Sequence, residues 1–303
     1  MTDVAGTGFT TLDRVYSGGV KVSEALGGSC GNVLISLAML GWSVVPLLSL
    51  GCDAAGSSLV EEFRQAGADT GYIWRRAGVS SPILAQLLDV EAALHSFSKV
   101  CPQTGEALPR YQPVSNEDVE AAQSVLAECR VFYADRLSPS ILLAMESAAT
   151  GAAVIFFEPS RIGERELFDR ALRLCTVLKW SSEQLPVELT DRIVDADTVA
   201  VVTHGARGLE IFAHGQQRCC ACAPAMAVRD SCGAGDMLSV GIIDWLLGSS
   251  WSGTDRFEMD YFLAGVTAGQ RLAAANCACV GARGVFRERG RDGVRRILDG
   301  SSG

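Results

Sequence analysis

The chain has 303 residues, of which 48% are hydrophobic, and a formal net charge of −9 at pH 7. This length can bury the core of one large domain. The acidic balance argues against nucleic acid as a partner, because phosphate-backbone binding takes its affinity from clustered Lys and Arg. No secretory signal and no apolar stretch of membrane-spanning length can be recognised. We therefore expect a cytoplasmic protein that binds neither nucleic acid nor membrane.

The eleven cysteines are scattered through apolar segments, unlike the dense framework of small secreted disulfide proteins. We expect most of them to be buried, reduced thiols. Cys219, Cys220 and Cys222 raise the possibility of a zinc site, but no second pair of cysteines or histidines accompanies them. A strand-like run with small apolar cysteines explains this C-C-A-C segment better.

Apolar strands alternate with helical periodicity from the first residues onward. The pattern predicts strands over Val4–Phe9 and Val44–Leu50 and helices over Asn32–Leu40 and Leu59–Ala66. The rhythm continues through Val131–Ala134, Ile141–Ala149, Ala153–Phe157, Cys175–Lys179 and Val199–Thr203. Such repetition is typical of a parallel sheet covered by helices. The expected fold is α/β with three layers, a doubly wound and mostly parallel sheet with helices on both faces.

The pattern changes between Trp74 and Pro113, where short alternating segments lie around Ile83–Leu88 and His95–Lys99 and a proline-rich stretch follows. Proline ends helices and central strands alike. This region is therefore predicted to leave the main sheet as a small antiparallel flap.

Helical periodicity returns after Gly233, over Met237–Leu247 and Asp255–Ala275. A basic segment follows, and it includes Arg283, Arg287, Arg289 and Arg291. Its pattern predicts a solvated surface helix.

The segment Asp230–Asp236 reads D-S-C-G-A-G-D and opens one of these helices. Its small residues let backbone N–H groups approach a ligand, and a helix N-terminus adds partial positive charge, so the site favours an anion. Asp236 falls in the first turn, where a carboxylate beside an anion hole suits deprotonation of an attacking hydroxyl. Phosphoryl transfer needs both parts. An ordinary helix start with a stabilising acid is the alternative reading of the same pattern.

A second glycine-rich segment, Gly27–Asn32 with the sequence G-G-S-C-G-N, precedes the first predicted helix. Together with D-S-C-G-A-G-D it resembles the two sequence signatures of the ribokinase-like (PfkB) family of carbohydrate and nucleoside kinases. Further similarities follow in chain order, namely Asp13, G-C-D-A-A-G at 51–56, E-P-S at 158–160, Glu183 and V-T-H-G-A-R-G at 202–208. The resemblance implies one ribokinase-like domain over 1–303, with a lid from about 13–27 and 74–113.

The resemblance implies ATP-dependent transfer of the γ-phosphoryl group to a hydroxyl of a small sugar. Asp236 would be the base, and the amides of Gly233, Ala234 and Gly235 would form the anion hole. The groups that would hold the substrate hydroxyls are Asp13, Gly28 and Asn32.

The implied cofactors are ATP and Mg²⁺, with a monovalent cation near Asp230 as a further possibility of the family. The residues that the resemblance places near the nucleotide are Thr203, Gly205, Gly208 and, close to the adenine, Asn276. Glu183 would hold Mg²⁺ through water. The Asn of the family's N-x-x-E is Trp180 here, so Glu183 lacks its usual partner.

The interval from Asp13 to Gly27 is short, because many family members have lid strands between the corresponding positions. The short interval predicts a reduced lid. Exclusion of water would then fall to the 74–113 region or to a second subunit in a homodimer.

Other functions fit parts of the sequence. A nucleoside kinase of the same fold uses the same residues, and a sugar- or nucleotide-binding regulatory protein that has lost turnover would explain Trp180. Gly27–Gly31 also fits the G-x-S-x-G elbow of α/β-hydrolases, but Lys21–Leu26 is a weak strand and no HGGG-like segment precedes it. A P-loop and a complete G-x-G-x-x-G are both missing from the sequence.

Overall fold

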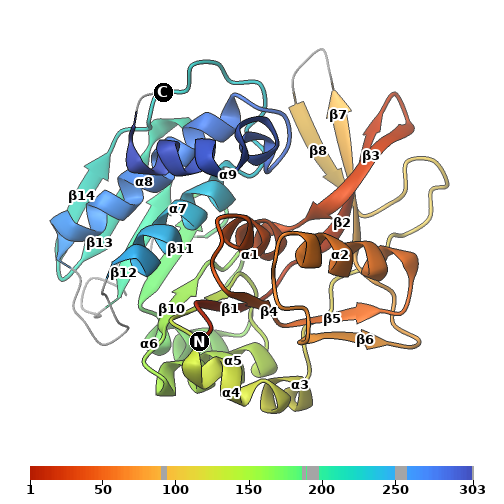
Figure 1. Cartoon of the computed structure of the whole chain (residues 1–303), viewed down its shortest axis with the longest axis horizontal. Helices are drawn as coiled ribbons and strands as arrows, with labels where there is room; N and C mark the ends of the chain where they lie inside the picture. The colour runs from red at the N-terminus through yellow and green to blue at the C-terminus, as the bar shows by residue number, and fades with distance from the viewer. Residues whose placement is uncertain (90–93, 186–188, 190–197, 250–257, 302–303) are drawn as a thin grey trace.

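The computed structural model describes the chain apart from residues 90–93, 186–188, 190–197, 250–257 and 302–303. Its central sheet has the strand order β14-β13-β12-β11-β10-β9-β1-β4 (Figure 1). These strands are β1 (Val4–Thr7), β4 (Val44–Pro46), β9 (Val131–Ala134), β10 (Val154–Phe157), β11 (Val177–Ser181), β12 (Val199–Thr203), β13 (Leu209–Ala213) and β14 (Gln216–Cys220). All neighbours from β12 to β4 pair in parallel, and β13 and β14 continue the sheet antiparallel.

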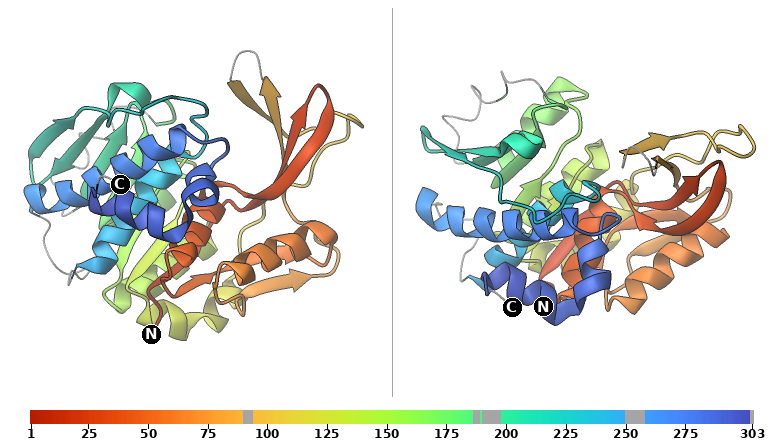
Figure 2. Two further views of the ribbon diagram at one scale, coloured as in Figure 1. Left: turned by 45° about the horizontal axis from the view of Figure 1, so that its top comes forward. Right: turned by 90° about the horizontal axis from the view of Figure 1, so that it is seen from above.

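Helices cover both faces of this sheet, as the layers in Figure 2 show. One face carries α1 (Ser29–Met39), α2 (Ala54–Gln65), α7 (Ala234–Gly248), α8 (Met259–Cys277) and α9 (Gly284–Asp299). The other face carries α3 (Asn116–Ala121), α4 (Gln123–Glu128), α5 (Pro139–Thr150) and α6 (Arg165–Leu174). The three-layer, mostly parallel α/β prediction is confirmed.

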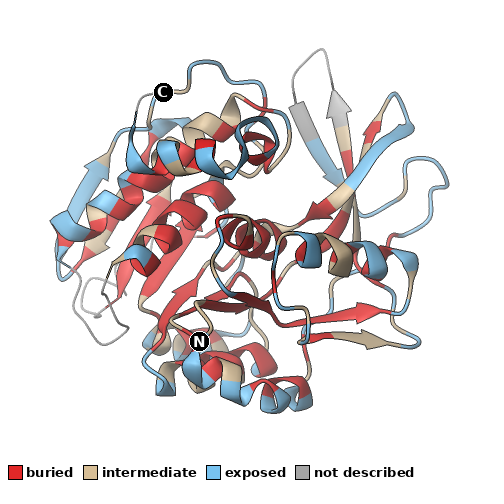
Figure 3. Ribbon diagram, in the orientation of Figure 1, coloured by how far each residue is buried: buried red, intermediate tan, exposed pale blue. Residues whose placement is uncertain are grey.

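The strands of the central sheet are buried on both sides, which explains why they are continuous apolar runs (Figure 3). Alternate residues point into opposite cores. In β9, Tyr133 packs into the core of the α1 and α7 face, and its neighbour Phe132 packs into the core of the α5 face. The two faces of each strand therefore pack against the two helical layers.

The carboxyl edge of the sheet opens between β1 and β9. From β1 the chain first winds to β4 on one side, and it later returns to β9 on the other side of β1. Open α/β sheets bind ligands at such a switch point, because the connections leave the strand ends in opposite directions and a crevice remains between them.

A second sheet stands apart from the central one, in the order β3-β2-β7-β8. We call it the small sheet, and its strands are β2 (Thr11–Ser17), β3 (Val20–Gly27), β7 (Ile83–Asp89) and β8 (Leu94–Ser98). The antiparallel flap predicted within residues 74–113 is present as the β7–β8 hairpin, and the segment before α1 adds the antiparallel β2–β3 hairpin. β2 and β7 are parallel, because the second hairpin arrives after the α1 to β6 crossover rather than through a tight turn.

Several local predictions need correction. The strand predicted over Val44–Leu50 is two strands, β4 and β5 (Leu48–Gly51), and β5 pairs with β6 (Ile73–Arg76) outside the central sheet. Lys21–Leu26, a weak strand by its sequence, is part of the longer strand β3.

The cysteines and the basic segment differ from expectation as well. All eleven cysteines are free thiols, yet only four of them are buried, so the prediction that most are buried is wrong. Arg283 is 8% exposed instead of solvated, because its guanidinium donates to the Leu26 carbonyl at 2.8 Å and pairs with Glu62 at 3.3 Å. Within the described residues, no helix is long and apolar enough to cross a membrane.

Candidate active site

The start of α7 lies beside the carboxyl edge of the central sheet. Gly233 caps it in the left-handed conformation, with φ of 74°, and a Cβ at this position would lie 2.5 Å from the Cα of Ala282. The backbone geometry therefore requires glycine at position 233.

Gly235 has no such structural requirement. A Cβ built there would meet only the Lys179 Nζ atom, at 3.8 Å. The missing side chain leaves free space in front of the first amides of α7, where the helix dipole and unpaired N–H groups favour an anion. Gly233, Ala234 and Gly235, the residues predicted to form the anion hole, thus cap and open this helix.

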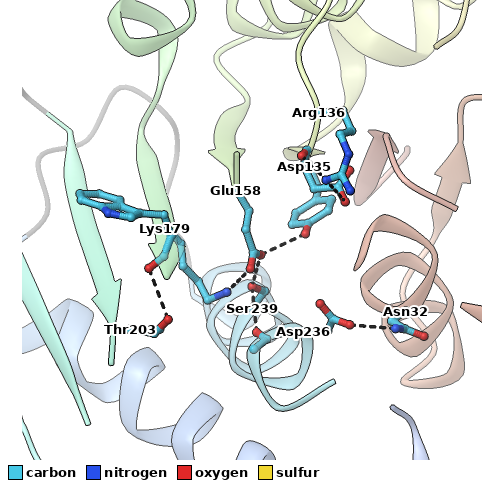
Figure 4. Close-up of polar contacts among 11 residues, drawn as sticks. Asn32, Asp135, Arg136, Glu158, Lys179, Thr203, Asp236 and Ser239 are labelled. Carbon is cyan, nitrogen blue, oxygen red and sulfur yellow. Dashed lines mark hydrogen bonds and ion pairs between the residues drawn. The ribbon is translucent and has the colours of Figure 1, made fainter. Parts of the chain in front are cut away.

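Asp236 lies in the first turn of α7 and is 9% exposed. Asn32 from α1 donates to its Oδ2 atom at 2.8 Å, as Figure 4 shows. Burial, followed by the nearby charge of Glu158, raises the pKa of Asp236 to about 7, against the lowering effects of Asn32 and Lys179. A carboxylate with this pKa accepts a proton near neutral pH far better than an ordinary aspartate.

A buried polar network supports this carboxylate from the side of the sheet. Glu158, at the end of β10, forms an ion pair with Lys179 and accepts hydrogen bonds from Tyr133 at 3.0 Å and Ser239 at 2.6 Å (Figure 4). The Lys179 side chain is 2% exposed. The sequence analysis assigned no role to Lys179, although a lysine within the apolar run of β11 was a visible signal, since a buried lysine needs a charged partner.

The three predicted substrate residues meet at the root of the small sheet. Asp13 on β2 accepts a hydrogen bond from Thr11 at 2.5 Å, and burial raises its pKa to about 6. Gly28 has φ of 79° and packs against the Phe9 carbonyl. The Asn32 Oδ1 atom is buried and makes no hydrogen bond within the described part of the chain, so it is available to a ligand hydroxyl.

Three predicted nucleotide residues lie at the end of β12 and in the loop from β12 to β13. The Thr203 hydroxyl donates to the Trp180 carbonyl at 3.3 Å, Gly205 has open space around it, and Gly208 packs against the Cys220 carbonyl. Glu183 is exposed in the turn after β11. Trp180 is 1% exposed and packs in the core of the α5 face, so position 180 offers no polar ligand.

Asn276, which the resemblance places close to the adenine, makes its hydrogen bonds with the segments around the start of α7. It is fully buried in α8, its amide donates to the Cys232 carbonyl at 3.1 Å, and its Oδ1 atom accepts from the Val285 amide at 3.1 Å. Asp230 holds the same region together, because its carboxylate accepts from the amides of Cys232 at 2.8 Å and Gly281 at 2.6 Å. The Asn276 side chain therefore supports the loop before α7.

Residues 10–285 match the description "pfkB family carbohydrate kinase". The chain belongs to this family. Its members are phosphotransferases that act on sugar hydroxyls, and this is the class of enzyme to which the chain is assigned. No curated protein matched the chain.

Solved structures of pfkB-type kinases have the same fold. Fructokinase from Xylella fastidiosa with bound ATP gives a TM-score of 0.77 at 17% identity, with 100% of both chains covered. Ribokinase from Giardia lamblia gives 0.76 at 15% identity, with 99% of both chains covered. Aminoimidazole riboside kinase from Salmonella enterica, complexed with aminoimidazole riboside and an ATP analog, gives 0.74 at 19% identity, covering 98% of this chain and 100% of that one.

The pfkB assignment bears on the metal question. In the described part of the chain, no group of three or more His, Cys, Asp or Glu side chains could hold a metal ion. Mg²⁺ does not require such a group, because it keeps several waters and is commonly held by one or two carboxylates together with substrate phosphates. Cys219 and Cys220 end the edge strand β14, as the strand interpretation predicted, but Cys222 lies beyond the strand, and Cys219 and Cys222 are exposed rather than packed.

Proposed function

We propose that the protein transfers the γ-phosphoryl group of ATP to a hydroxyl of a small sugar, with Asp236 as the general base. The observation that carries this proposal is the pairing of a buried carboxylate at the start of α7 with the open space at Gly235. The base and the anion hole lie in the same turn of α7. A hydroxyl that reaches Asp236 would therefore face the phosphorus atom of the bound phosphate, which the hydroxyl oxygen attacks.

Acceptor hydroxyls would bind Asp13 and Asn32, from opposite sides of the Gly27–Gly28 turn. The Asn32 amide donates to Asp236, which fixes the orientation of the base, and its free oxygen supports a hydrogen bond from a second acceptor hydroxyl. The carboxylate would take the proton from the attacking hydroxyl as the oxygen approaches phosphorus.

The phosphates would bind the amides of Gly233, Ala234 and Gly235. The Lys179 Nζ atom would lie at the edge of this phosphate site. ATP would extend from there toward Thr203, Gly205 and Gly208, at the carboxyl ends of the strands. Mg²⁺, held through water by Glu183, would offset the charge that gathers on the transferring phosphate. Asn276 would act through the loop before α7.

The small sheet would be the lid. Its two hairpins stand over the acceptor residues on β2 and at the end of β3, and closure would exclude water and suppress ATP hydrolysis. The β2–β3 hairpin is complete despite the short Asp13 to Gly27 interval.

An assay of ATP-dependent phosphorylation over a panel of sugars and nucleosides tests the proposal. Turnover of at least one sugar is expected, and Asp236→Asn is expected to lose most of kcat while still binding ATP and acceptor. No turnover on any acceptor, with binding intact, would instead favour a regulatory binding protein. Turnover of nucleosides alone would make the protein a nucleoside kinase of the same mechanism.

A further inference from the structure

A pocket of about 680 Å³ lies between the small sheet and the carboxyl edge of the central sheet. Its walls come from the segments after β1, β9 and β10 and from the chain on both sides of the β7–β8 hairpin. This is the β1–β9 switch point of the fold, and the volume is in the range of about 300–1,000 Å³ of ligand pockets in general. Asp236 does not line this pocket, so the pocket extends the catalytic site and does not contain it.

The charge of the pocket is opposite to that of the protein. Four basic residues line it, Lys99, Arg110, Arg136 and Arg161, against two acidic ones, Asp135 and Glu164. Four minus two leaves a formal charge of +2 in a chain whose net charge is −9. Low-dielectric walls concentrate such a field and raise the local concentration of anions.

Arg136 forms the fixed part of this basic wall. Its guanidinium donates to the Asp135 carbonyl at 2.7 Å and to the Asp135 carboxylate at 3.1 Å, and it lies 4.5 Å above the Phe9 ring. The buried Asp135 in turn accepts the Phe9 amide at 2.7 Å. The arginine is held in place before any ligand arrives, which lowers the entropy cost of binding.

The other three cations have unused binding capacity. Lys99, Arg110 and Arg161 are exposed, and none of their side chains forms an ion pair or hydrogen bond with the residues described. They come from three separate segments, which lie after β8, before α3 and after β10. Like charges that the fold brings to one cavity repel one another, and an anion between them would relieve this repulsion.

The pocket is continuous with the proposed acceptor site. Thr11 lines it and donates to Asp13, while Phe9 lines it and packs its carbonyl against Gly28. Asp135 is close enough to Asp236 for its charge to affect that carboxyl. An acceptor whose reacting hydroxyl faces Asp236 would therefore extend its far end toward the arginines.

We propose that the acceptor is a sugar derivative that carries an anionic group, a carboxylate or a phosphate, and that Arg110, Arg136 and Arg161 bind this group. This inference rests on the proposed kinase function and names the substrate class of the same site. Arginine binds both anions through paired N–H donors, so both sources share one chemistry. A neutral sugar would use the carboxylates and Asn32 but leave the basic wall without a ligand.

The test compares matched acceptors at one ionic strength: glucose, gluconate, glucose 6-phosphate and 2-keto-3-deoxygluconate, with uridine as a neutral nucleoside. At least one anionic acceptor is expected to have a kcat/KM above every neutral one. Arg110→Ala and Arg161→Ala should each lower kcat/KM for that anion by about 10- to 100-fold, mainly through KM, as expected for a hydrogen bond to a charged group. Both side chains are exposed, so the fold should tolerate their loss. The preferred anion then identifies carboxylate or phosphate as the group bound.

Arg165→Ala is the matched control, since Arg165 is exposed at the start of α6 but does not line the pocket. It should leave the preference between anionic and neutral acceptors as in the wild type. A neutral sugar or nucleoside as the best acceptor would overturn the inference, as would equal losses on neutral and anionic acceptors in the Arg110 and Arg161 variants.

Calorimetry separates this inference from the proposed function. If no acceptor is phosphorylated but an anionic one binds, and Arg161→Ala weakens that binding, the kinase proposal fails and the basic pocket stands. If a neutral sugar is phosphorylated in an Asp236-dependent reaction and no anion binds, the kinase proposal stands and the basic pocket fails.

Discussion

At the scale of single residues, the environment of Asp236 decides how the enzyme responds to pH. Its carboxyl has a pKa of about 7, because burial and the Glu158 charge disfavour ionisation more than Asn32 and Lys179 favour it. Only the ionised form can accept a proton. The rate should therefore rise with pH up to about 7 and then level off.

The acidic limb of the pH–rate profile is the range in which the rate rises with pH. Substitutions of the charged neighbours of Asp236 should move this limb in opposite directions. Glu158→Gln removes a negative charge and should shift the limb of kcat/KM to lower pH, whereas Lys179→Met removes a positive charge and should shift it to higher pH. The measurement is a pH profile at saturating ATP, with Ser239→Ala as a control that loses a hydrogen bond to Glu158 but no charge. Identical limbs in all variants would mean that Asp236 is not the titrating base.

Glycine at position 235 is required by the proposed phosphate site but not by the fold. Gly235→Ala should leave the protein at least as stable, since alanine in a helix is favoured over glycine by about 0.5–1 kcal/mol and no backbone atom is in the way. The new methyl group would enter the anion hole, and kcat should fall by about 10²- to 10³-fold, as for loss of one oxyanion donor.

Gly248→Ala provides the control for this substitution. Gly248 ends the same helix and also has free space around it, so alanine there should change neither stability nor rate by a large factor. Full activity in Gly235→Ala would place the phosphates elsewhere.

At the scale of elements, Arg283 connects α9 to the root of the small sheet. Its guanidinium binds the Leu26 carbonyl at the end of β3 and the Glu62 carboxylate of α2, and Glu62 also accepts the Leu26 amide at 2.5 Å. Loss of one partner leaves buried polar groups without hydrogen bonds.

Arg283→Ala should therefore destabilise the protein by about 2 kcal/mol or more and raise KM for the acceptor more than it lowers kcat. Denaturant unfolding and steady-state kinetics measure the two effects. Arg289→Ala, at an exposed position of the same helix, should change neither. An unchanged KM in a correctly folded Arg283→Ala would show that this contact does not position the small sheet.

Some elements could be predicted because their signals are local. β9 and β12 are apolar runs with the predicted bounds, and the G-A-G before Asp236 marked the start of α7. The parallel β2–β7 pair joins residues about 70 positions apart, and no local pattern encodes that register.

The same distinction applies to the candidate site. Asp236, Asn32 and Gly28 follow from their motifs and come together as expected. The ion pair of Lys179 with Glu158 and the burial of Asn276 and Arg283 depend on contacts between distant segments. A single sequence gives the type of these residues but not their partners.

At the scale of the whole molecule, three buried carboxyls make stability depend on pH. The pKa is raised to about 6 for Asp13 and Asp135 and to about 7 for Asp236, chiefly by burial. Between pH 4 and 7 the folded state therefore binds more protons than the unfolded state, so the free energy of unfolding falls as pH rises.

From pH 6 to pH 8 these groups together should lower the free energy of unfolding by about 2 kcal/mol, from about 1.4 kcal/mol per pKa unit. Asp236→Asn keeps the hydrogen bond from Asn32 and should remove about two thirds of this decrease, because the pKa of Asp236 is the highest of the three. Urea unfolding of the ligand-free protein at both pH values tests the sign, and a wild type that is more stable at pH 8 would contradict it.

The contact of Arg283 with Leu26 also has a consequence for the timing of synthesis. Asp13, Gly28 and Asn32 leave the ribosome early. Arg283, which donates to the Leu26 carbonyl beside them, leaves it after nearly all other described elements. A nascent chain can form the first strands long before the acceptor site has its final support. Cleavage between α8 and α9 would, by the same reasoning, disable the enzyme while every proposed catalytic residue remained in the larger fragment.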